Sequence, residues 1–507
     1  MSSKVRVRFA PSPTGGLHLG GVRTVLYNYL FARHHGGEFV LRIEDTDQSR
    51  YVPGAEEYIY ETLEWCGLVP DESPLKGGPY GPYRQSERKP MYRPYAERLV
   101  AAGQAYYAFD TPEELDAMRS ELRTDANPNP QYDGQVRARM RNSLSLPPDE
   151  VQRLLDAGTP HVVRIKMPPG ETVTLTDMIR GDVSFDTSTV DDKVLLKADG
   201  MPTYHLAVVV DDHLMKITHA FRGEEWLPSA PVHILLWRYL FGEDAMPQWA
   251  HLPLILGPSG KLSKRDGARY GFPVFAANWT DPKSNELTEG FRERGFLPEA
   301  FVNLLALLGW NDGTDQELFS LEELVERFSI QKVHKGGAQF NFEKAQWFNH
   351  EWIKRSSPAR LLPEVKALFQ SKGWDTKDDA FLETVIGLVK ERCTLLADFV
   401  PQAGFFFEQP SSYDSASFIA KWTPEKAAFF ERLADTFGQE PDVADADREA
   451  AFKSAAEAAA IKPGELQLPL RVMLVGGKFG PPVFTIAGLL GGAETAARIR
   501  KALAAIG

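Results

Sequence analysis

The chain has 507 residues, more than one hydrophobic core organises, so about three or four domains are expected. Charged residues make up 25% and apolar residues 43%, as in ordinary globular proteins, and no run of eighteen apolar residues predicts a membrane span. Only two cysteines occur, which excludes a disulfide framework and a four-cysteine zinc site. The N-terminal stretch lacks the apolar region of a signal peptide, so we expect a cytoplasmic protein.

The net charge of −12 at first argues against a nucleic-acid partner. Net charge, however, constrains solubility more than it constrains local binding. Lysines and arginines gather in three stretches, residues 84–98, 137–141 and 261–269. Because such stretches are more often plain solvated faces, the charge pattern alone neither predicts nor excludes nucleic-acid binding.

The first fifty residues predict the start of a parallel sheet. Residues 4–10 alternate as a strand does, 22–35 carry apolar residues on one helical face, and 39–43 form a second apolar strand. A Gly-rich loop, 11–21, lies between the first strand and the helix, and an acidic run, 44–47, follows the second strand. Ligands bind beyond the carboxyl ends of such strands, where both segments lie.

Later segments predict an interruption and then a helical half. Residues 107–190 combine polar helical pieces with short strands, which indicates an insertion between two halves of a nucleotide-binding fold. Apolar strands are predicted again at 193–197, 205–210 and 252–256. From about residue 297 onward helical patterns dominate, so an interrupted α/β half precedes an all-α half.

The loop 11–21 carries the first chemistry. It ends at a helix start, where unpaired backbone N–H groups and the helix dipole attract anions. Its glycines allow close approach of a bulky ligand, and His18 could donate a hydrogen bond to a phosphate. A Gly-rich turn with a surface histidine is the simpler alternative. A Walker A loop and a GxGxxG fingerprint are both absent.

The second chemical group is GPSGKLSKRDGA, residues 257–268. Lys261 and Lys264 among glycines suit a triphosphate whose negative charge must be neutralised as pyrophosphate leaves. A solvated basic loop is the alternative that this stretch alone favours.

Both groups, in this order on one α/β pattern, resemble the HIGH and KMSKS signatures of class I aminoacyl-tRNA synthetases. Further stretches narrow the resemblance to bacterial glutamyl-tRNA synthetases over essentially the whole chain: FAPSPTGGLHLGG, LRIEDTD, GPYRQSER, DGMPTYHLAVVVDDH, RGEEWL and PLRVMLVGGKFGPPVFTIAGLLG. The resemblance implies an α/β, Rossmann-like catalytic domain with an inserted acceptor-binding domain, followed by an all-α anticodon-binding half.

The expected domain boundaries follow from these patterns and from the resemblance. They are the first half of the catalytic domain (1–106), the insertion (107–190), the second catalytic half (191–256), the KLSKR loop with a stem-contact domain (257–325), and helical anticodon-binding domains (326–507).

The resemblance also implies site residues. For glutamate these are Arg8, Ala10, Ser12, Glu44, Tyr204, Arg222 and Trp226, with the two arginines around the amino acid and Glu44 as partner of its ammonium group. Arginine's planar fork suits the carboxylates of glutamate. The catalytic residues are His18, Lys261 and Lys264, and ATP would be bound by Gly20, Gly21, Ser263, Lys264 and Arg265. Simpler alternatives are a metal site or helix cap at the acidic run, an arginine paired to an acid, and aromatic core residues.

The implied reaction uses ATP and Mg²⁺. Some relatives carry zinc in the insertion, but Ala108, Asp110, Val136 and Ala138 stand where those relatives place their ligands, so we expect no zinc. The expected partners are tRNA(Glu), glutamate and ATP, without a membrane, and the protein is expected to be a monomer.

The sequence leaves several alternative functions open. A glutaminyl-tRNA synthetase would end in β-barrels, against the helical pattern. A truncated relative that glutamylates a tRNA base would lack the anticodon half. A non-tRNA nucleotidyltransferase would use the helical half for protein interaction, and a non-catalytic paralogue would have no need of His18, Lys261 and Lys264 together.

Overall fold

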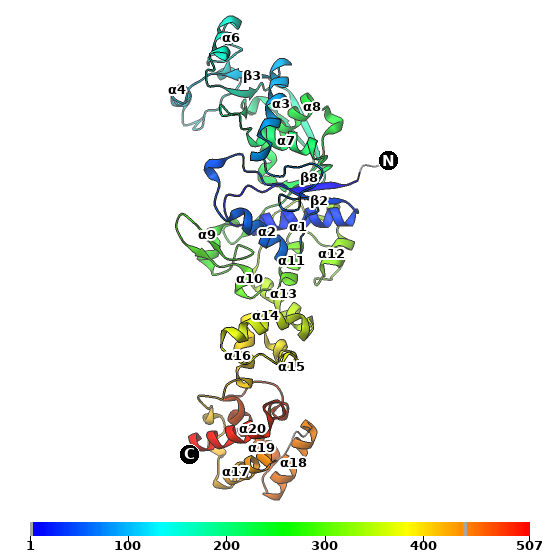
Figure 1. Ribbon diagram of the computed structural model, residues 1–507, viewed down its shortest axis with the longest axis vertical. Coiled ribbons are helices and arrows are strands. Elements are labelled where there is room, and N and C mark those ends of the chain that lie inside the picture. Colours follow the sequence, from blue (N-terminus) through cyan, green and yellow to red (C-terminus); the bar gives the residue numbers. More distant parts are fainter. Residues whose placement is uncertain (1–3, 440–443, 507) are drawn as a thin grey trace. The chain divides into compact units, whose positions relative to one another are not determined.

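The computed structural model describes residues 4–439 and 444–506 (Figure 1). The chain divides into two compact units. The first comprises Met1–Glu293 and Pro298–Phe342, and the second comprises Arg294–Leu297 and Glu343–Gly507. None of the described helices combines the length and hydrophobicity that crossing a lipid bilayer requires.

A six-stranded sheet forms the centre of the first unit, in the order β2-β1-β8-β9-β5-β6. Neighbouring strands from β2 to β5 pair in parallel, and β6 pairs antiparallel with β5 at the edge. The strands are β1 (Arg6–Phe9), β2 (Glu38–Leu41), β5 (Thr172–Asp177), β6 (Gly181–Asp186), β8 (His219–Gly223) and β9 (Gln248–Leu252).

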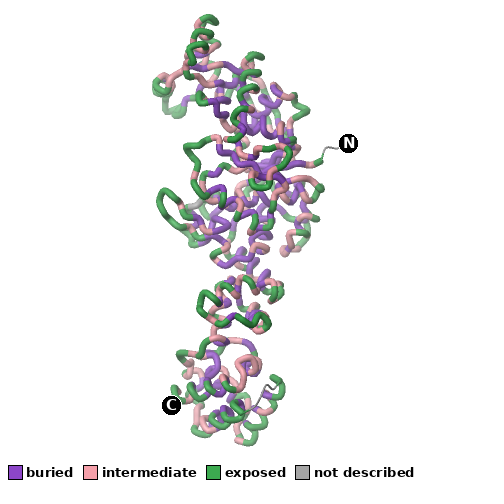
Figure 2. Tube along the Cα trace, viewed as in Figure 1, coloured by how far each residue is buried: buried purple, intermediate pink, exposed green. Residues whose placement is uncertain are grey.

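Helices cover this sheet and bury its apolar residues. Helix α1 (Leu19–His34) connects β1 to β2 and packs against α11 (Pro298–Leu307) and α12 (Leu321–Arg327). Residues of α3 (Lys89–Ala101), α7 (Tyr204–Leu214) and α8 (Ala230–Leu240) contribute to a second part of the core, and α2 (Ala55–Trp65) follows β2. The buried residues gather around the sheet (Figure 2). The sheet is therefore held rigidly enough to position residues at its strand ends.

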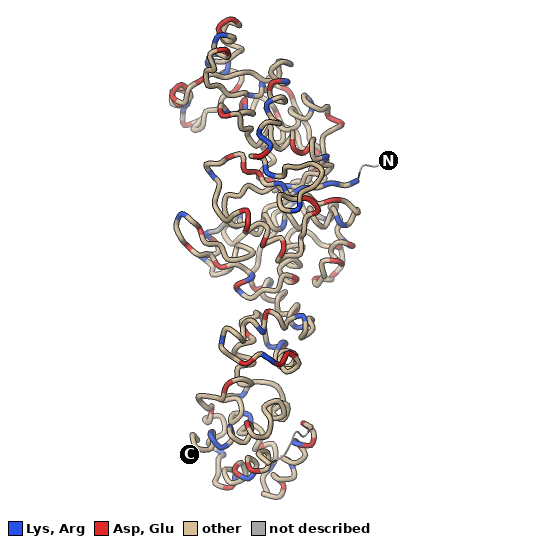
Figure 3. The backbone as a smooth tube through the Cα atoms, viewed as in Figure 1, with Lys and Arg blue, Asp and Glu red and all other residues tan. Residues whose placement is uncertain are grey.

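An antiparallel three-stranded sheet in the order β3-β4-β7 lies within the chain segment between α3 and α7. Its strands are β3 (Ala105–Ala108), β4 (Val162–Ile165) and β7 (Val194–Leu196), accompanied by α4 (Pro112–Leu122), α5 (Gly134–Arg137) and α6 (Pro148–Asp156). Helix α6 buries none of its residues, and both acidic and basic residues occur over this region (Figure 3).

Short elements complete the first unit after β9. A three-stranded sheet pairs β10 (Ile255–Gly257) with β11 (Gly260–Lys261) and β14 (Ala338–Gln339), and β12 (Trp279–Thr280) pairs with β13 (Leu287–Thr288). Helix α9 (Lys264–Tyr270) follows β11, and α10 (Phe291–Arg294) ends at the unit boundary.

The described residues of the second unit form helices and no strand. The helices are α13 (Phe342–Arg355), α14 (Pro358–Ser371), α15 (Asp379–Val389), α16 (Phe399–Ala403), α17 (Pro424–Gln439), α18 (Asp445–Ala458), α19 (Pro463–Val475) and α20 (Val483–Ile506). Gly491 breaks the helical geometry inside α20 with a φ of 79°, a conformation that glycine adopts without strain.

One predicted strand is wrong. Residues 205–210 lie in α7, a helix, because a run of consecutive apolar residues cannot be assigned by periodicity. Five successive residues from Leu206 to Val210 are buried, so this helix has no polar face at that point. The predicted strand 252–256 is interrupted: β9 ends at Leu252 and β10 begins at Ile255, with Pro253, which has no N–H to donate, between them.

Candidate active site

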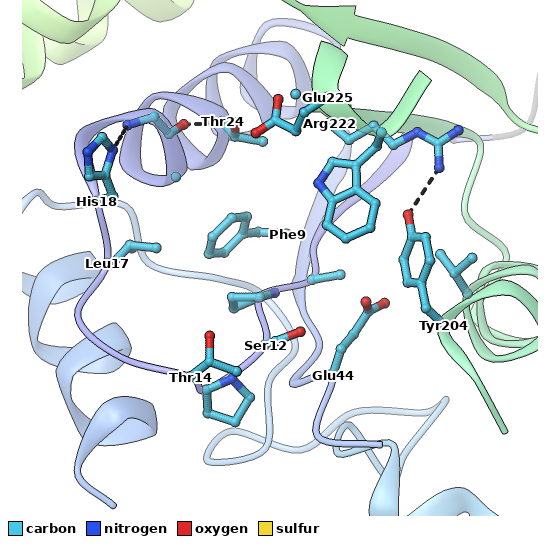
Figure 4. Close-up of a pocket in the computed structure, with 18 of the residues that line it drawn as sticks. Phe9, Ser12, Thr14, Leu17, His18, Thr24, Glu44, Tyr204, Arg222 and Glu225 are labelled. Carbon is cyan, nitrogen blue, oxygen red and sulfur yellow. Dashed lines mark hydrogen bonds between the residues drawn. The ribbon is translucent and has the colours of Figure 1, made fainter. Parts of the chain in front are cut away.

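A cavity of about 920 Å³ opens at the carboxyl ends of β1, β2, β8 and β9 (Figure 4). Most residues predicted for the site line it: Arg8, Ala10, Ser12, His18, Gly20, Gly21, Glu44, Tyr204, Arg222, Trp226, Lys261 and Ser263. Arg265 is exposed and is not among the lining residues. Lys264 begins α9, but its side chain lies outside the part of the structure that is described.

The Gly-rich loop ends as an N-cap of α1. The backbone N–H of Gly20 donates to His18 Nδ1 at 3.3 Å, so His18 is held at the first turn of the helix (Figure 4). A Cβ on Gly16 would lie 2.9 Å from Trp279, and one on Gly21 would lie 2.6 Å from Leu17. Aromatic rings leave no room for a Cβ at Gly16, whereas one at Gly21 would displace only the end of the Leu17 side chain. A Cβ on Gly20 would have its nearest neighbour at 3.9 Å. Gly20 therefore leaves open backbone facing the cavity at the positive end of a helix.

The acidic run after β2 separates into different roles. Glu44 is buried and accepts a hydrogen bond from Arg42 Nη2 at 3.1 Å, and burial raises the pKa of Glu44 to about 7. Asp45 accepts from the backbone N–H and the hydroxyl of Ser86, at 2.8 and 2.6 Å. Glu44 is directed at the space beside Tyr204 (Figure 4), whereas both carboxylate oxygens of Asp45 are occupied by Ser86. Nowhere among the described residues do three histidine, cysteine or acidic side chains gather as a metal site would need.

Arg8 is held by a buried carboxylate. Its Nε donates to both oxygens of Asp212, at 3.0 and 3.2 Å, and its Nη1 donates to the carbonyl of Phe221 at 3.2 Å. Asp212 also forms an ion pair with Arg42 at 2.8 Å, and these two arginines lower the pKa of Asp212 although burial opposes its ionisation. A buried ionic lattice thus supports this end of the cavity.

Arg222 has a different environment at the end of β8. Its Nε donates to His251 Nε2 at 2.9 Å, and its Nη1 lies 3.1 Å from both Tyr204 Oη and His233 Nδ1. The remaining nitrogen, Nη2, is buried without a hydrogen-bond partner in the described chain. Since a guanidinium carries only donors, this atom requires an acceptor supplied from the cavity side.

Two aromatic rings and a basic loop complete the cavity. The ring of Trp226 packs 4.7 Å from that of Tyr204, and Trp226 is 44% exposed. Lys261 lies at the rim, where its Nζ is 3.3 Å from Glu225 Oε1. Ser263 caps α9 and donates its hydroxyl to Asp266 at 2.7 Å.

Several supporting residues were missed by the sequence reasoning. Asp212 lies in the quoted stretch DGMPTYHLAVVVDDH and Glu225 in RGEEWL, so the motifs contained them without indicating a role. His233 and His251 lie in no quoted motif, and no sequence signal pointed to them.

Three of the four positions predicted to lack zinc ligands have packing or hydrogen-bonding roles. Ala108 and Val136 belong to a small apolar cluster with Tyr106, Met118 and Tyr132. Asp110 accepts from the hydroxyl of Tyr132 at 2.8 Å and from the backbone N–H of Arg141 at 2.7 Å. The absence of zinc stays a prediction.

Comparisons with known proteins agree on one family. Residues 4–347 match the catalytic domain of class I tRNA synthetases (E and Q), and residues 350–503 match an anticodon-binding domain. A glutamate–tRNA ligase of Porphyromonas gingivalis is 50% identical over 510 residues, covering 100% of this chain and 99% of that protein. One of Cytophaga hutchinsonii is 49% identical, covering 99% and 98%.

The fold comparison gives the same result. A crystal structure of a glutamate–tRNA ligase from Elizabethkingia meningosepticum has a TM-score of 0.93 and 48% identity, with both chains covered completely. The predicted class I catalytic fold followed by a helical anticodon-binding half is confirmed. The chain therefore belongs to the glutamate–tRNA ligases, a family of class I aminoacyl-tRNA synthetases.

Proposed function

We propose that the cavity activates glutamate with ATP to glutamyl-adenylate and pyrophosphate, and that the glutamyl group is then transferred to the 3′-terminal adenosine of tRNA(Glu). The observation that carries this proposal is the opposed chemistry of Glu44 and Arg222. A buried carboxylate and a buried guanidinium with an unused donor face one cavity, as an amino acid with an ammonium group and a side-chain carboxylate requires. Arg8, Ala10, Ser12, Tyr204 and Trp226 complete the glutamate site.

ATP would lie against the start of α1. The open backbone at Gly20, with Gly21 and His18 beside it, suits a phosphate. The substrate α-carboxylate attacks the α-phosphorus, so no protein nucleophile is needed. His18, Lys261 and Lys264 would stabilise negative charge on the phosphates, with Ser263 and Arg265 beside them.

Mg²⁺ would enter this scheme together with ATP. The ion commonly keeps most of its ligands from phosphate and water. Both carboxylate oxygens of Asp45 are occupied by Ser86, and the described residues hold no cluster of three acidic, histidine or cysteine side chains, so we assign Mg²⁺ no protein ligands. When bound, the ion would supply positive charge that offsets the negative charge of the nucleotide.

The insertion at 107–190 would receive the acceptor end of the tRNA, and the helical domains after residue 326 would read the anticodon. The same proposal includes the catalytic halves at 1–106 and 191–256, the stem-contact domain at 257–325, a monomeric state and a cytoplasmic location.

Transfer of labelled glutamate onto a tRNA(Glu) transcript tests the function. We expect ATP-dependent charging with glutamate and none with glutamine. Charging with glutamine would favour a glutaminyl-tRNA synthetase, whose catalytic domain belongs to the same matched family model. If well-folded protein charged the tRNA with neither amino acid, the proposal would be wrong.

Lys264→Ala tests the role of the basic loop. If Lys264 contacts the phosphates in the transition state, its loss should slow single-turnover adenylate formation about 100-fold or more while changing glutamate binding little. Lys283→Ala is a matched control, because Lys283 is exposed and does not line the cavity. An unchanged rate for Lys264→Ala would remove this residue from the mechanism.

A further inference from the structure

The guanidinium of Arg222 is held by neutral acceptors rather than by carboxylates. Its described hydrogen-bond partners are His251, His233 and Tyr204, and the guanidinium also lies over the ring of Trp249, 4.7 Å from its centre. Because arginine has no acceptor, His251 Nε2 and His233 Nδ1 must both be unprotonated where they face it. The positive charge of Arg222 is therefore not neutralised by any of the described side chains that hold it.

The ring nitrogen of His251 and of His233 that faces away from Arg222 carries the proton and donates it to another residue. His251 Nδ1 donates to Asp177 Oδ2 at 2.6 Å, and the side chains of both residues are fully buried. His233 Nε2 lies 3.2 Å from His205 Nδ1 and donates to it. Burial lowers the pKa of His233 far below its usual value and that of His205 to about 4, and it also lowers the pKa of His251.

The hydrogen bonds that Asp177 accepts favour its ionised form. It accepts from the backbone N–H groups of Ile179, Arg180 and His251 at 2.9, 3.0 and 3.0 Å, besides the His251 ring. Although burial opposes ionisation, the bond from the His251 ring and these backbone donors lower the pKa of Asp177. An ionised carboxylate accepts only, so it keeps the His251 proton on Nδ1.

The sheet brings these three residues together. Arg222 in β8 and His251 in β9 are register partners, and Asp177 ends β5, where it pairs with Trp249 of β9. The line from Asp177 through His251 to Arg222 therefore crosses three neighbouring strands. Its far end is Nη2 of Arg222, which is buried without a partner in the described chain, in a side chain that lines the cavity.

We propose that Asp177 and His251 are positioning residues that make Arg222 select a side-chain carboxylate over a carboxamide, an inference that rests on the proposed glutamate site. Asp177 holds His251 in the tautomer whose Nε2 accepts from Arg222, and this fixes the guanidinium with Nη2 toward the substrate. Since the supporting groups at Arg222 are neutral imidazoles and a phenol, the arginine keeps its full charge for the substrate. An anionic side chain completes the pairing, and a neutral carboxamide does not.

The central test is Asp177→Asn in the full-length enzyme. An asparagine amide can donate to His251 Nδ1, which moves the ring proton to Nε2 and places two donors against each other at Arg222. We expect KM for glutamate to rise about 10- to 100-fold and KM for ATP to change less than about threefold. We also expect the ratio of kcat/KM for glutamate over glutamine to fall by a similar factor.

His251→Gln is the conservative variant, because a glutamine amide can donate to Asp177 and accept from Arg222 at once. We expect it to raise KM for glutamate less than Asp177→Asn does, and less than His251→Leu, which can do neither. It also keeps the inference testable if Asp177→Asn fails to fold. Asp182→Asn is the matched control, since Asp182 lies on the same hairpin but is exposed and hydrogen-bonded to Thr176.

Arg222→Gln distinguishes failure of the proposed glutamate site from failure of the positioning role of Asp177 and His251. If this variant leaves KM for glutamate unchanged, the proposed glutamate site itself is wrong. If it raises KM whereas Asp177→Asn and His251→Gln both match the control, only the positioning role is overturned. When Asp177→Asn is added to Arg222→Gln, we expect no further rise in KM for glutamate, because Asp177 acts through Arg222; additive effects would contradict the inference.

Discussion

Two arginines lie at the carboxyl ends of β1 and β8 and differ in what holds them. Arg8 is bound by the carboxylate of Asp212, which also pairs with Arg42. The charge of Arg8 is therefore largely compensated inside the fold. Arg222 is bound by two histidines and a tyrosine and keeps its charge. Both arginines line the cavity, but Arg8 shares its charge with a buried carboxylate, whereas the charge of Arg222 is not paired with a carboxylate among its described hydrogen-bond partners.

The two environments have different consequences for stability and for substrate selectivity. A buried ion pair contributes little net free energy, but removing one member leaves an uncompensated charge at high cost. A buried guanidinium among neutral acceptors instead retains unused attraction for an anion. Loss of the carboxylate that Arg8 and Arg42 share should therefore act mainly on folding, and substitutions among the residues that hold Arg222 mainly on the choice of substrate.

The largest expected effect is that of Asp212→Asn on stability. The substitution keeps the shape of the side chain but removes the charge that Arg8 and Arg42 share, so we expect the unit that contains the sheet to lose about 3–5 kcal/mol of unfolding free energy. Urea denaturation followed by circular dichroism measures this. Asp116→Asn, at an exposed residue paired with Arg119, serves as control and should change little. Equal effects of the two variants would contradict a structural role for the lattice.

The sequence predicted much of the fold where local periodicity and burial agree. The first strand, helix and second strand are found as β1, α1 and β2, and the helical half is confirmed. Helix α7 could not be recognised, because its run of buried apolar residues carries no helical period. What decides its conformation is packing within the core, which the local sequence does not express.

The site was predictable only in part. Residues next to glycine or acidic motifs, such as His18 and Glu44, could be found by motif and resemblance. The support of Arg222 could not, because Asp177 and His251 lie 74 positions apart and meet only through the pairing of β5 with β9. A contact that depends on strand register leaves no trace in either segment alone.

A smaller expected effect is the pH dependence of KM for glutamate, which should come from Glu44 and not from the histidines around Arg222. Burial raises the pKa of Glu44 to about 7, whereas it lowers the pKa of His205 to about 4 and also lowers those of His233 and His251. A raised carboxyl pKa means that Glu44 becomes protonated as pH falls below about 7 and loses its attraction for the substrate ammonium group. Between pH 8 and 6 we expect KM for glutamate to rise, approaching about tenfold per unit below pH 7.

A variant that lacks the ionisable group at position 44 is the control for this pH dependence. Glu44→Gln should raise KM for glutamate and remove its dependence on pH over the same interval. A flat profile for the unmodified enzyme would mean that the ionisation of Glu44 does not govern glutamate binding.

The smallest expected effect concerns a third cation, Lys261, which pairs with Glu225 at 3.3 Å in an exposed setting, 56% and 44% for the two side chains. An exposed pair contributes little to stability, so Glu225→Gln should change the melting temperature by about 1 °C or less. Removing the carboxylate also removes repulsion toward the phosphates and frees Lys261, so KM for ATP should fall about twofold at low salt. High salt should erase this difference, because screening acts on exposed charges. A large rise in KM for ATP would instead make Glu225 part of the nucleotide site. The rim of the cavity would then contain a carboxylate that serves substrate binding, unlike Asp212, whose carboxylate serves stability.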